Sequence, residues 1–353
     1  MIAFVESKRP DMGRVARLLE RCADANQWAN RGPLYRHLAE AYGGHFGLEV
    51  DRIVTPCANG GVALEAMARL LSQRAGRPLR WVGSAFSFRN LGRGHFADMT
   101  FVDCDAQGLM DMEEVRTLDP DSFDGLVVVN PFGLVRDFSP FVDFARETGK
   151  ALLLDNAAGV DRTVPDWPWQ AFSLHHTKPY GAGEGGLALT PADAAEDLYA
   201  LLNYGPVPED PAAWLNNGKI SDIACAFLID RLERVDDWAP RYRAQAARVA
   251  RIAGQAGLRP LCPPGPSNAA APATSQPYLS PAPIPTARIA AARHLTLGKY
   301  YKPLADRPRT RGLFARLVNV PTHPDVAGLH DADLAGDLAG LCAAPPAGGP
   351  SPG

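Results

Sequence analysis

Residues 125–155 read GLVVVNPFGLVRDFSPFVDFARETGKALLLD, and this stretch decides the fold. Two short apolar runs, 126–129 and 151–154, lie on either side of a helical pattern at 140–148. Continuous apolar strands separated by helices are typical of a parallel sheet that is covered on both faces. In such sheets, functional groups gather in the crevice at the carboxyl ends of the strands. Asp155 stands at one of these ends.

The same alternation continues through the first two thirds of the chain. It predicts further strands at 52–54, 79–82, 100–102 and 187–189, and helices at 34–42 and 62–71. Beyond about residue 235 the texture changes, and helical patterns are expected at 238–256, 287–297 and 331–341. The segment 263–285 is dense in proline. It has short possible edge strands near Tyr278, but its prolines exclude a central strand.

These patterns predict an α/β fold with two domains. We expect a large domain over 1–235, with an N-terminal arm and a mostly parallel sheet flanked by helices. A smaller C-terminal α/β domain should cover 236–342. The last segment, 343–353 (AAPPAGGPSPG), cannot bury apolar surface and is predicted to be a disordered tail.

Composition narrows the classes of function. Of the 353 residues, 46% are hydrophobic. The net charge is -3, so the chain lacks the basic excess that would indicate a nucleic-acid partner. No uncharged run is long enough to cross a bilayer, and the N-terminus lacks a signal-peptide core. The six cysteines are scattered with no CxxC pair, which indicates reduced thiols in a cytoplasmic protein and no metal site.

One lysine has an unusual setting. Residues 173–178 (SLHHTK) lead into the glycine-rich turn 181–186 (GAGEGG) and the apolar run 187–189. The ordinary interpretation of Lys178 is a surface lysine before a loop. Two features favour a functional role: Phe172 and Leu187 place the segment near the core, and the glycines let backbone approach a ligand closely.

Asp155 also has a structural and a functional interpretation. A carboxylate at the end of a buried strand is costly unless it is paired, although an Asp here can also be a turn or helix-cap residue. An enzyme that uses pyridoxal phosphate (PLP) needs such a carboxylate to keep the pyridine nitrogen protonated. A strand-end Asp155 followed by a loop Lys178 suits opposite sides of one ring.

A phosphate-binding turn is the third candidate feature. Asn59-Gly60-Gly61 follows a strand-like run and opens a helix, whose N-terminal N–H groups can bind phosphate. Alone, this signal is weak. It matches neither the dinucleotide-binding fingerprint nor a P-loop, so it gives no support to nicotinamide or nucleoside-triphosphate binding.

Together these motifs resemble those of the DegT/StrS-type sugar aminotransferases, a family of fold-type-I PLP enzymes, over nearly the whole chain. The resemblance implies the fold of that class. The matching motifs are Arg31-Gly32-Pro33, 59–64 (NGGVAL), Ser87-Phe88, 101–105 (FVDCD), 129–133 (VNPFG), 153–158 (LLDNAA), 172–178 with 183–186, 217–223 (NGKISDI), 299–304 (KYYKPL) and 318–323 (VNVPTH).

The resemblance also implies roles for individual residues. Lys178 would carry the cofactor as a Schiff base and move a proton on the substrate, and Asp155 would pair with the pyridinium. Phe88 would stack on the ring. The remaining expected positions are Gly60, Gly61 and Ser173 at the phosphate, Ala158 beside the phenolic oxygen, Asn217 at the phosphate of a neighbouring subunit in a homodimer, and His176, Lys219 and Tyr301 toward the substrate.

The expected reaction moves an amino group from an amino acid, with glutamate as the expected donor, to a nucleotide-linked keto-sugar. Ala158 stands where the family usually has Gln or Glu, Gly61 where it has a hydroxyl residue, and Leu154 where Glu is common. Two alternatives therefore stay open. One is a PLP enzyme of another reaction type or with a non-sugar natural-product substrate. The other is a non-enzymatic relative that binds a ligand or partner.

Overall fold

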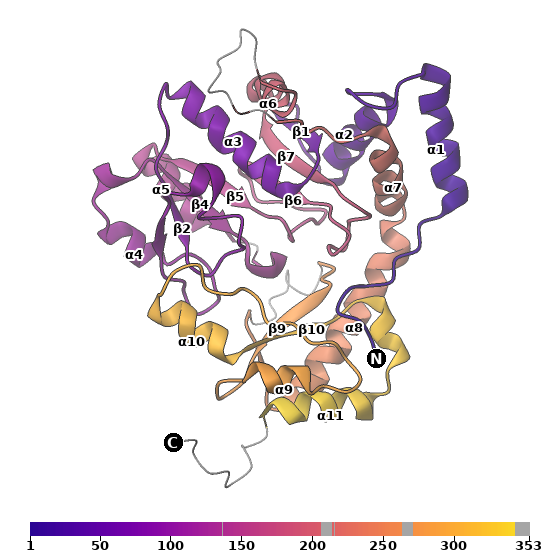
Figure 1. Cartoon of the computed structure of the whole chain (residues 1–353), viewed down its shortest axis with the longest axis vertical. Helices are drawn as coiled ribbons and strands as arrows, with labels where there is room; N and C mark the ends of the chain where they lie inside the picture. The colour runs from indigo at the N-terminus through magenta and orange to yellow at the C-terminus, as the bar shows by residue number, and fades with distance from the viewer. Residues whose placement is uncertain (136, 206–213, 215, 263–270, 343–353) are drawn as a thin grey trace.

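The computed structural model describes residues 1–135, 137–205, 214, 216–262 and 271–342. Two sheets, one in each half of the molecule, organise these residues (Figure 1). The predicted tail at 343–353 lies outside the described residues, as does the 263–270 part of the proline-rich segment.

The larger sheet has seven strands in the order β1-β7-β6-β5-β4-β2-β3. Its five strands from β6 to β3 run parallel, while β7 is antiparallel to both β6 and β1. The expectation of a mostly parallel sheet is confirmed. The strands are β1 (Arg52–Cys57), β2 (Trp81–Ser84), β3 (Thr100–Val102), β4 (Gly125–Val129), β5 (Ala151–Asp155), β6 (Gln170–Ser173) and β7 (Gly186–Pro191).

Helices cover both faces of this sheet because alternate side chains of the buried strands point to opposite sides. On one face, α3 (Gly60–Arg74) and α6 (Ala195–Leu202) pack on Val127, Leu153 and Ala171. The other face is covered by α1 (Met12–Ala25), α2 (Pro33–His45), α4 (Met112–Thr117), α5 (Ser139–Thr148) and α7 (Asp222–Glu233). Asp155 pairs in register with Ala171, so its side chain lies on the α3 face.

The smaller sheet is antiparallel, in the order β10-β9-β8. Its strands are β8 (Arg259–Pro260), β9 (Ser275–Leu279) and β10 (Leu317–Pro321), packed with α8 (Val235–Gln255), α9 (Thr286–Ala290) and α11 (Asp331–Cys342). The long helix α8 contributes to both halves. Trp238 and Tyr242 pack in the core beside the large sheet, whereas Val249 and Ile252 belong to the core of the small one.

Two local expectations in this half were wrong. β9 is a central strand even though it contains Pro277. The Pro277 carbonyl accepts the Leu261 amide (3.0 Å), so the position without an N–H faces the very short β8 and the β9–β10 ladder loses no donor. The helix expected over 287–297 ends at Ala290, because the Asp337 carboxylate binds the next backbone amides at 293–295.

An N-terminal arm links the two halves (indigo in Figure 1). Ile2 pairs with the backbone of 294–296 in the small half, and the Ala3 carbonyl lies 3.0 Å from His323 Nε2. Further along, Asp11 caps α1, and its backbone N–H donates to Asp230 on α7 (3.1 Å). The arm therefore contacts both halves of the molecule before the first helix begins.

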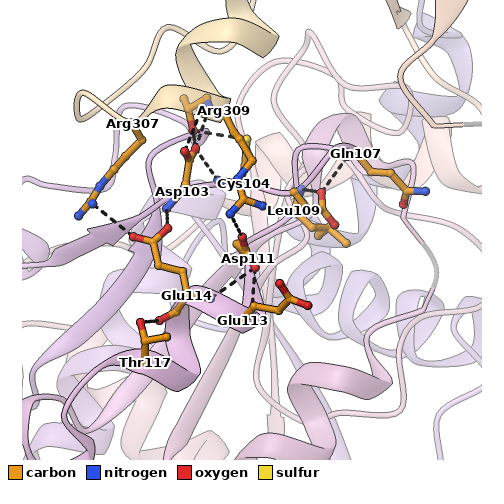
Figure 2. Close-up of polar contacts among 12 residues, drawn as sticks. Asp103, Cys104, Gln107, Leu109, Asp111, Glu113, Glu114, Thr117, Arg307 and Arg309 are labelled. Carbon is orange, nitrogen blue, oxygen red and sulfur yellow. Dashed lines mark hydrogen bonds and ion pairs between the residues drawn. The ribbon is translucent and has the colours of Figure 1, made fainter.

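A buried carboxylate fixes the other link. Asp103, just after β3, accepts hydrogen bonds from the backbone N–H groups of Arg309 and Thr310 and from the Thr310 hydroxyl, all at 2.7 Å (Figure 2). It thereby caps α10 (Pro308–Arg316), which otherwise lacks a side-chain cap. Two ion pairs flank it, Arg307–Glu114 at 3.2 Å and Arg309–Asp111 at 2.5 Å.

Replacing Asp103 by asparagine should lower the free energy of unfolding by about 1–3 kcal/mol at neutral pH, because buried donors lose a charged acceptor. Burial raises the pKa of Asp103, but the hydrogen bonds from Thr310, Arg309 and Cys104 outweigh burial and lower it overall. A carboxyl group with a lowered folded pKa contributes stability above its unfolded pKa, about 3.9, and loses it as the pH falls through the folded value.

Urea unfolding at pH 7 and at pH 3 measures this effect. The deficit of the Asp103→Asn variant should shrink at the lower pH. The exposed Asp98 supplies a matched control, Asp98→Asn. An equal deficit at both pH values would contradict the assignment.

Candidate active site

Asp155 ends β5 with only 4% of its surface exposed. Its Oδ2 accepts from Asn90 Nδ2 (3.4 Å), and its Oδ1 accepts from the Ala157 backbone N–H (3.2 Å). Burial raises the pKa of Asp155, and these hydrogen bonds and the charge of Lys178 oppose that rise. The carboxylate is thus poorly solvated and in electrostatic contact with the lysine.

Lys178 lies in a tight turn that is held by backbone hydrogen bonds within residues 174–185. The amides of Leu174 and His176 donate to the Gly185 and Gly183 carbonyls (2.8 and 2.7 Å). The Gly181 amide donates to the Lys178 carbonyl (3.0 Å). Burial lowers the pKa of Lys178, and Asp155 raises it. The structure therefore brings the two expected catalytic side chains together, with the amine biased toward its neutral, nucleophilic form.

The N-terminus of α3 lies beside the same strand ends. The Asn59 side chain caps it by accepting from the Val62 N–H (2.9 Å). A Cβ at Gly60 would lie 2.9 Å from the Phe172 carbonyl and 3.2 Å from the Cβ of Ser173, so only glycine fits there. The first turn of a helix leaves N–H groups for an anion. Gly60 and Gly61 thus open the helix next to Ser173, at the position where the sequence predicted a phosphate.

An aromatic cluster forms another wall. Tyr301 stacks on Phe132, with ring centroids 4.7 Å apart and planes at 7°, and meets Phe86 and Phe88 edge-on at 5.5 and 6.3 Å. Burial raises the pKa of Tyr301, and Asp155 contributes to that rise. Tyr301 therefore lies near the carboxylate. Phe88 itself is 50% exposed.

The other expected positions are more scattered. His176 is held through its backbone, and burial lowers the pKa of its ring. Lys219 contacts the Asn203 side chain and lies over the Tyr204 ring (5.2 Å). The Asn217 side chain is exposed, while the adjacent Gly218 carbonyl accepts the Ala58 N–H of the same chain (2.7 Å). Ala158 packs its backbone against Gly133, where a Cβ would come within 2.1 Å of the Ala158 carbonyl.

Sequence reasoning missed Asn90, which orients Asp155. Among the described residues, its Oδ1 and the Ser87 hydroxyl are buried without a hydrogen-bond partner. Its position two residues after Phe88 was the available signal. Beneath the site, Asn130 Nδ2 donates to the Asn156 side chain (2.7 Å), which in turn donates to Gln170 (3.3 Å). This chain of amides joins the residues that follow β4 and β5 to Gln170, the first residue of β6.

The residues present fit PLP. A buried carboxylate suits the pyridinium, a buried amine suits the aldehyde, and a helix N-terminus suits the phosphate. The orphaned polar atoms of Ser87 and Asn90 lie in the loop that also carries Phe88. Within the described residues no group of His, Cys, Asp and Glu is arranged to hold a metal ion, nor is any helix long and apolar enough to span a membrane.

Comparison with known proteins decides the family. The model of the DegT/DnrJ/EryC1/StrS aminotransferase family matches residues 12–273. The chain belongs to this family. Among curated relatives, the chain is 28% identical over 257 residues to Protein Rv3402c of Mycobacterium tuberculosis, covering 67% of this chain and 61% of that protein. It is 26% identical over 268 residues to the L-glutamine:2-deoxy-scyllo-inosose aminotransferase of Streptomyces fradiae, covering 67% and 62%.

The matched region thus spans less than two thirds of either curated relative. Among solved structures, DesI in the presence of its TDP-sugar product superposes with a TM-score of 0.75 at 23% identity, covering 95% of this chain and 91% of DesI. This likeness shows that nearly the whole chain, including the small C-terminal half, has the same fold as DesI.

Replacing Asp155 by asparagine should lower the pKa of Lys178 further, because it removes the charge that raises that pKa while burial remains. The measurement is the pH dependence of Lys178 acetylation by limiting acetic anhydride, read peptide by peptide by mass spectrometry. The midpoint should move to lower pH in Asp155→Asn. It should stay in place in Asp166→Asn, which alters an exposed carboxylate paired with Arg52. A midpoint that rises would contradict the pairing.

Proposed function

We propose that the chain is a PLP-dependent aminotransferase that transfers an amino group from an amino acid to a keto-sugar or a closely related cyclic ketone. The observation that carries the proposal is the buried Lys178 amine beside the buried Asp155 carboxylate, in a member of this aminotransferase family. When bound, PLP supplies an electron sink for the bonds at the amino-bearing carbon.

The protein's own residues would do the rest. Asp155 would keep the ring nitrogen protonated, and Asn90 would hold the carboxylate in its orientation. Gly60, Gly61 and Ser173 would bind the phosphate, and Phe88 would cover one ring face. The Lys178 amine, depressed in pKa by burial, would bind the aldehyde and then carry a proton to and from the substrate carbon.

The acceptor class rests on the relatives. DesI was solved with a TDP-sugar product, and the Streptomyces enzyme is named for a deoxy-inosose. Both names describe polyhydroxylated rings, so a keto group on such a ring is the substrate class, with a nucleotide-linked keto-sugar as first choice and a cyclitol as the second candidate. Glutamate is the proposed donor; the name of the Streptomyces relative adds glutamine. His176, Lys219 and Tyr301 are the proposed substrate contacts.

The proposal includes a homodimer with shared active sites. The exposed Phe88 and Asn217 side chains support it, because both belong to the expected cofactor site yet lie open in a single chain. It also includes the cytoplasm as location, which six free cysteines favour, since oxidising compartments promote disulfides. No nucleic-acid or membrane partner is proposed.

Purified protein loaded with PLP and freed of excess cofactor should show the visible absorbance band of a protonated imine, and Lys178→Ala should abolish it, because the imine needs the lysine amine. Adding glutamate or glutamine should bleach the band, and adding a suitable keto-sugar nucleotide or deoxy-inosose should restore it. The exposed Lys302 provides a matched control, Lys302→Ala, which should keep the band. A band that survives Lys178→Ala would remove the proposed function.

Mixing two inactive variants tests the shared site. In a hybrid dimer of Lys178→Ala with Asn217→Ala, one site would combine the intact Lys178 of one protomer with the intact Asn217 of the other. The hybrid should therefore recover about half of the wild-type activity per dimer, since one of two symmetric sites is complete. Rates measured on hybrids purified through two different tags give the answer. Activity no higher than that of either parent would place Asn217 in the site of its own chain.

A further inference from the structure

A second lysine grips the turn that carries Lys178. Lys8, in the N-terminal arm, donates from Nζ to the carbonyl oxygens of His176 (2.8 Å), Gly181 (2.7 Å) and Lys178 itself. An ammonium group has three protons, so these acceptors use all of its donors. The acceptors lie on both sides of Lys178 along the chain, which places the cation inside the curve of the turn.

A second cation binds another carbonyl group of the turn. Arg231 on α7 donates from Nε to the Pro179 oxygen (2.8 Å). Its guanidinium stacks on the Trp238 ring (4.0 Å) and pairs with Glu6 (3.3 Å), which is 7% exposed. Glu6 stands two residues before Lys8 in the arm. The arm and α7 together thus bind four carbonyl groups between positions 176 and 181.

The surroundings of Lys8 make its positive charge costly. Burial lowers the pKa of Lys8 to about 7, Arg231 lowers it too, and Glu6 opposes them. A buried cation is costly unless hydrogen bonds and an opposite charge compensate it. Three backbone carbonyl groups of the lysine turn offset part of this cost at Lys8, as the carbonyl groups of Ile284, Ala315 and Leu317 do for Lys299 in the small half.

We propose that Lys8 is a positioning residue for Lys178, fixing the backbone on either side of it so that its amine stays beside Asp155. The inference rests on the proposed function, because it assigns Lys8 a part in the same site. It gives the N-terminal arm a role in that site from outside the matched family region, which begins at residue 12. Lys8 acts through the turn and is assigned no contact with substrate or cofactor.

Hydrogen exchange on cofactor-free protein tests the positioning directly. The amides of His176, Lys178 and Gly181 are hydrogen-bonded within the turn and should exchange slowly. In Lys8→Met, which keeps length and removes all donors, their exchange should rise by about tenfold or more through local opening. Lys8→Arg, which keeps the charge, should fall between the two. Arg9→Met, at the exposed neighbouring cation, should match the wild type.

The second measurement is the pH dependence of Lys178 acetylation. A loosened turn exposes Lys178 to solvent and reduces the burial that lowers its pKa, so that pKa should rise toward the ordinary lysine value in Lys8→Met. Faster exchange in the turn without this change would show only a structural tie and would overturn the positioning role. Unchanged exchange in Lys8→Met would overturn the whole inference.

A shortened chain that begins at Val5 separates Lys8 from general docking of the arm, because it removes the contacts of Ile2 and Ala3 with the small domain and keeps Glu6 and Lys8. Its turn should remain protected. Loss of protection equal to that in Lys8→Met would assign the effect to the arm as a whole and overturn the specific role. Since none of these readouts needs PLP, failure of the visible-band test would remove the proposed function and leave the Lys8 result to stand or fall separately.

Discussion

The rest of the fold must support one costly interaction, the burial of the Asp155 carboxylate beside the Lys178 amine. Each group loses hydration worth several kcal/mol, and only the partner's charge and a few well-placed hydrogen bonds offset the loss. For Asp155 these are one amide side chain, one backbone N–H and the charge of Lys178. The groups come from three separate segments, so the fold must hold the loop after β2, the end of β5 and the glycine-rich turn in one register. A parallel sheet does so because its strand ends meet at one edge.

Elements far from that edge complete the site. Tyr301 stacks on the Phe132 ring. The segment that follows it is bound to the large half by the Leu304 amide on the Ala85 carbonyl (2.9 Å) and by Asp103 at the N-terminus of α10. The turn of Lys178 is fastened in the same manner by Lys8 and Arg231. In both places a charged side chain from one element binds several backbone groups of another. Such contacts are short-ranged and directional, so they fix position more strongly than apolar packing alone.

The sequence alone predicted what local pattern controls. Buried runs at 126–129 and 151–154 identified the sheet, and a polar residue at the end of such a run identified Asp155. The glycine-rich turn did the same for Lys178. Contacts across long separations carried no such signal: Asn90 and Lys8 precede their partners by many residues and stand in no periodic pattern. The prediction that prolines exclude a central strand was wrong at Pro277 for the same reason. Its effect on β9 depends on how far the neighbouring strand β8 extends, which local sequence does not show. The domain boundary near residue 235 and the roles of the site residues stay predictions.

The two buried lysines show how one side chain type serves two purposes. Burial lowers the pKa of both, yet Lys8 faces three carbonyl oxygens, which only an ammonium can satisfy fully. Lys178 has no hydrogen-bond acceptor for its amine among the described residues and feels only the Asp155 charge. Three acceptors bind the Lys8 amine to the backbone of the turn. Lys178 lacks such acceptors in the part of the chain that the structure describes, and its lowered pKa is what the proposed covalent role requires. The two amines differ in their neighbours. The N-terminal arm places Lys8 against backbone carbonyl groups, whereas the turn places Lys178 beside Asp155.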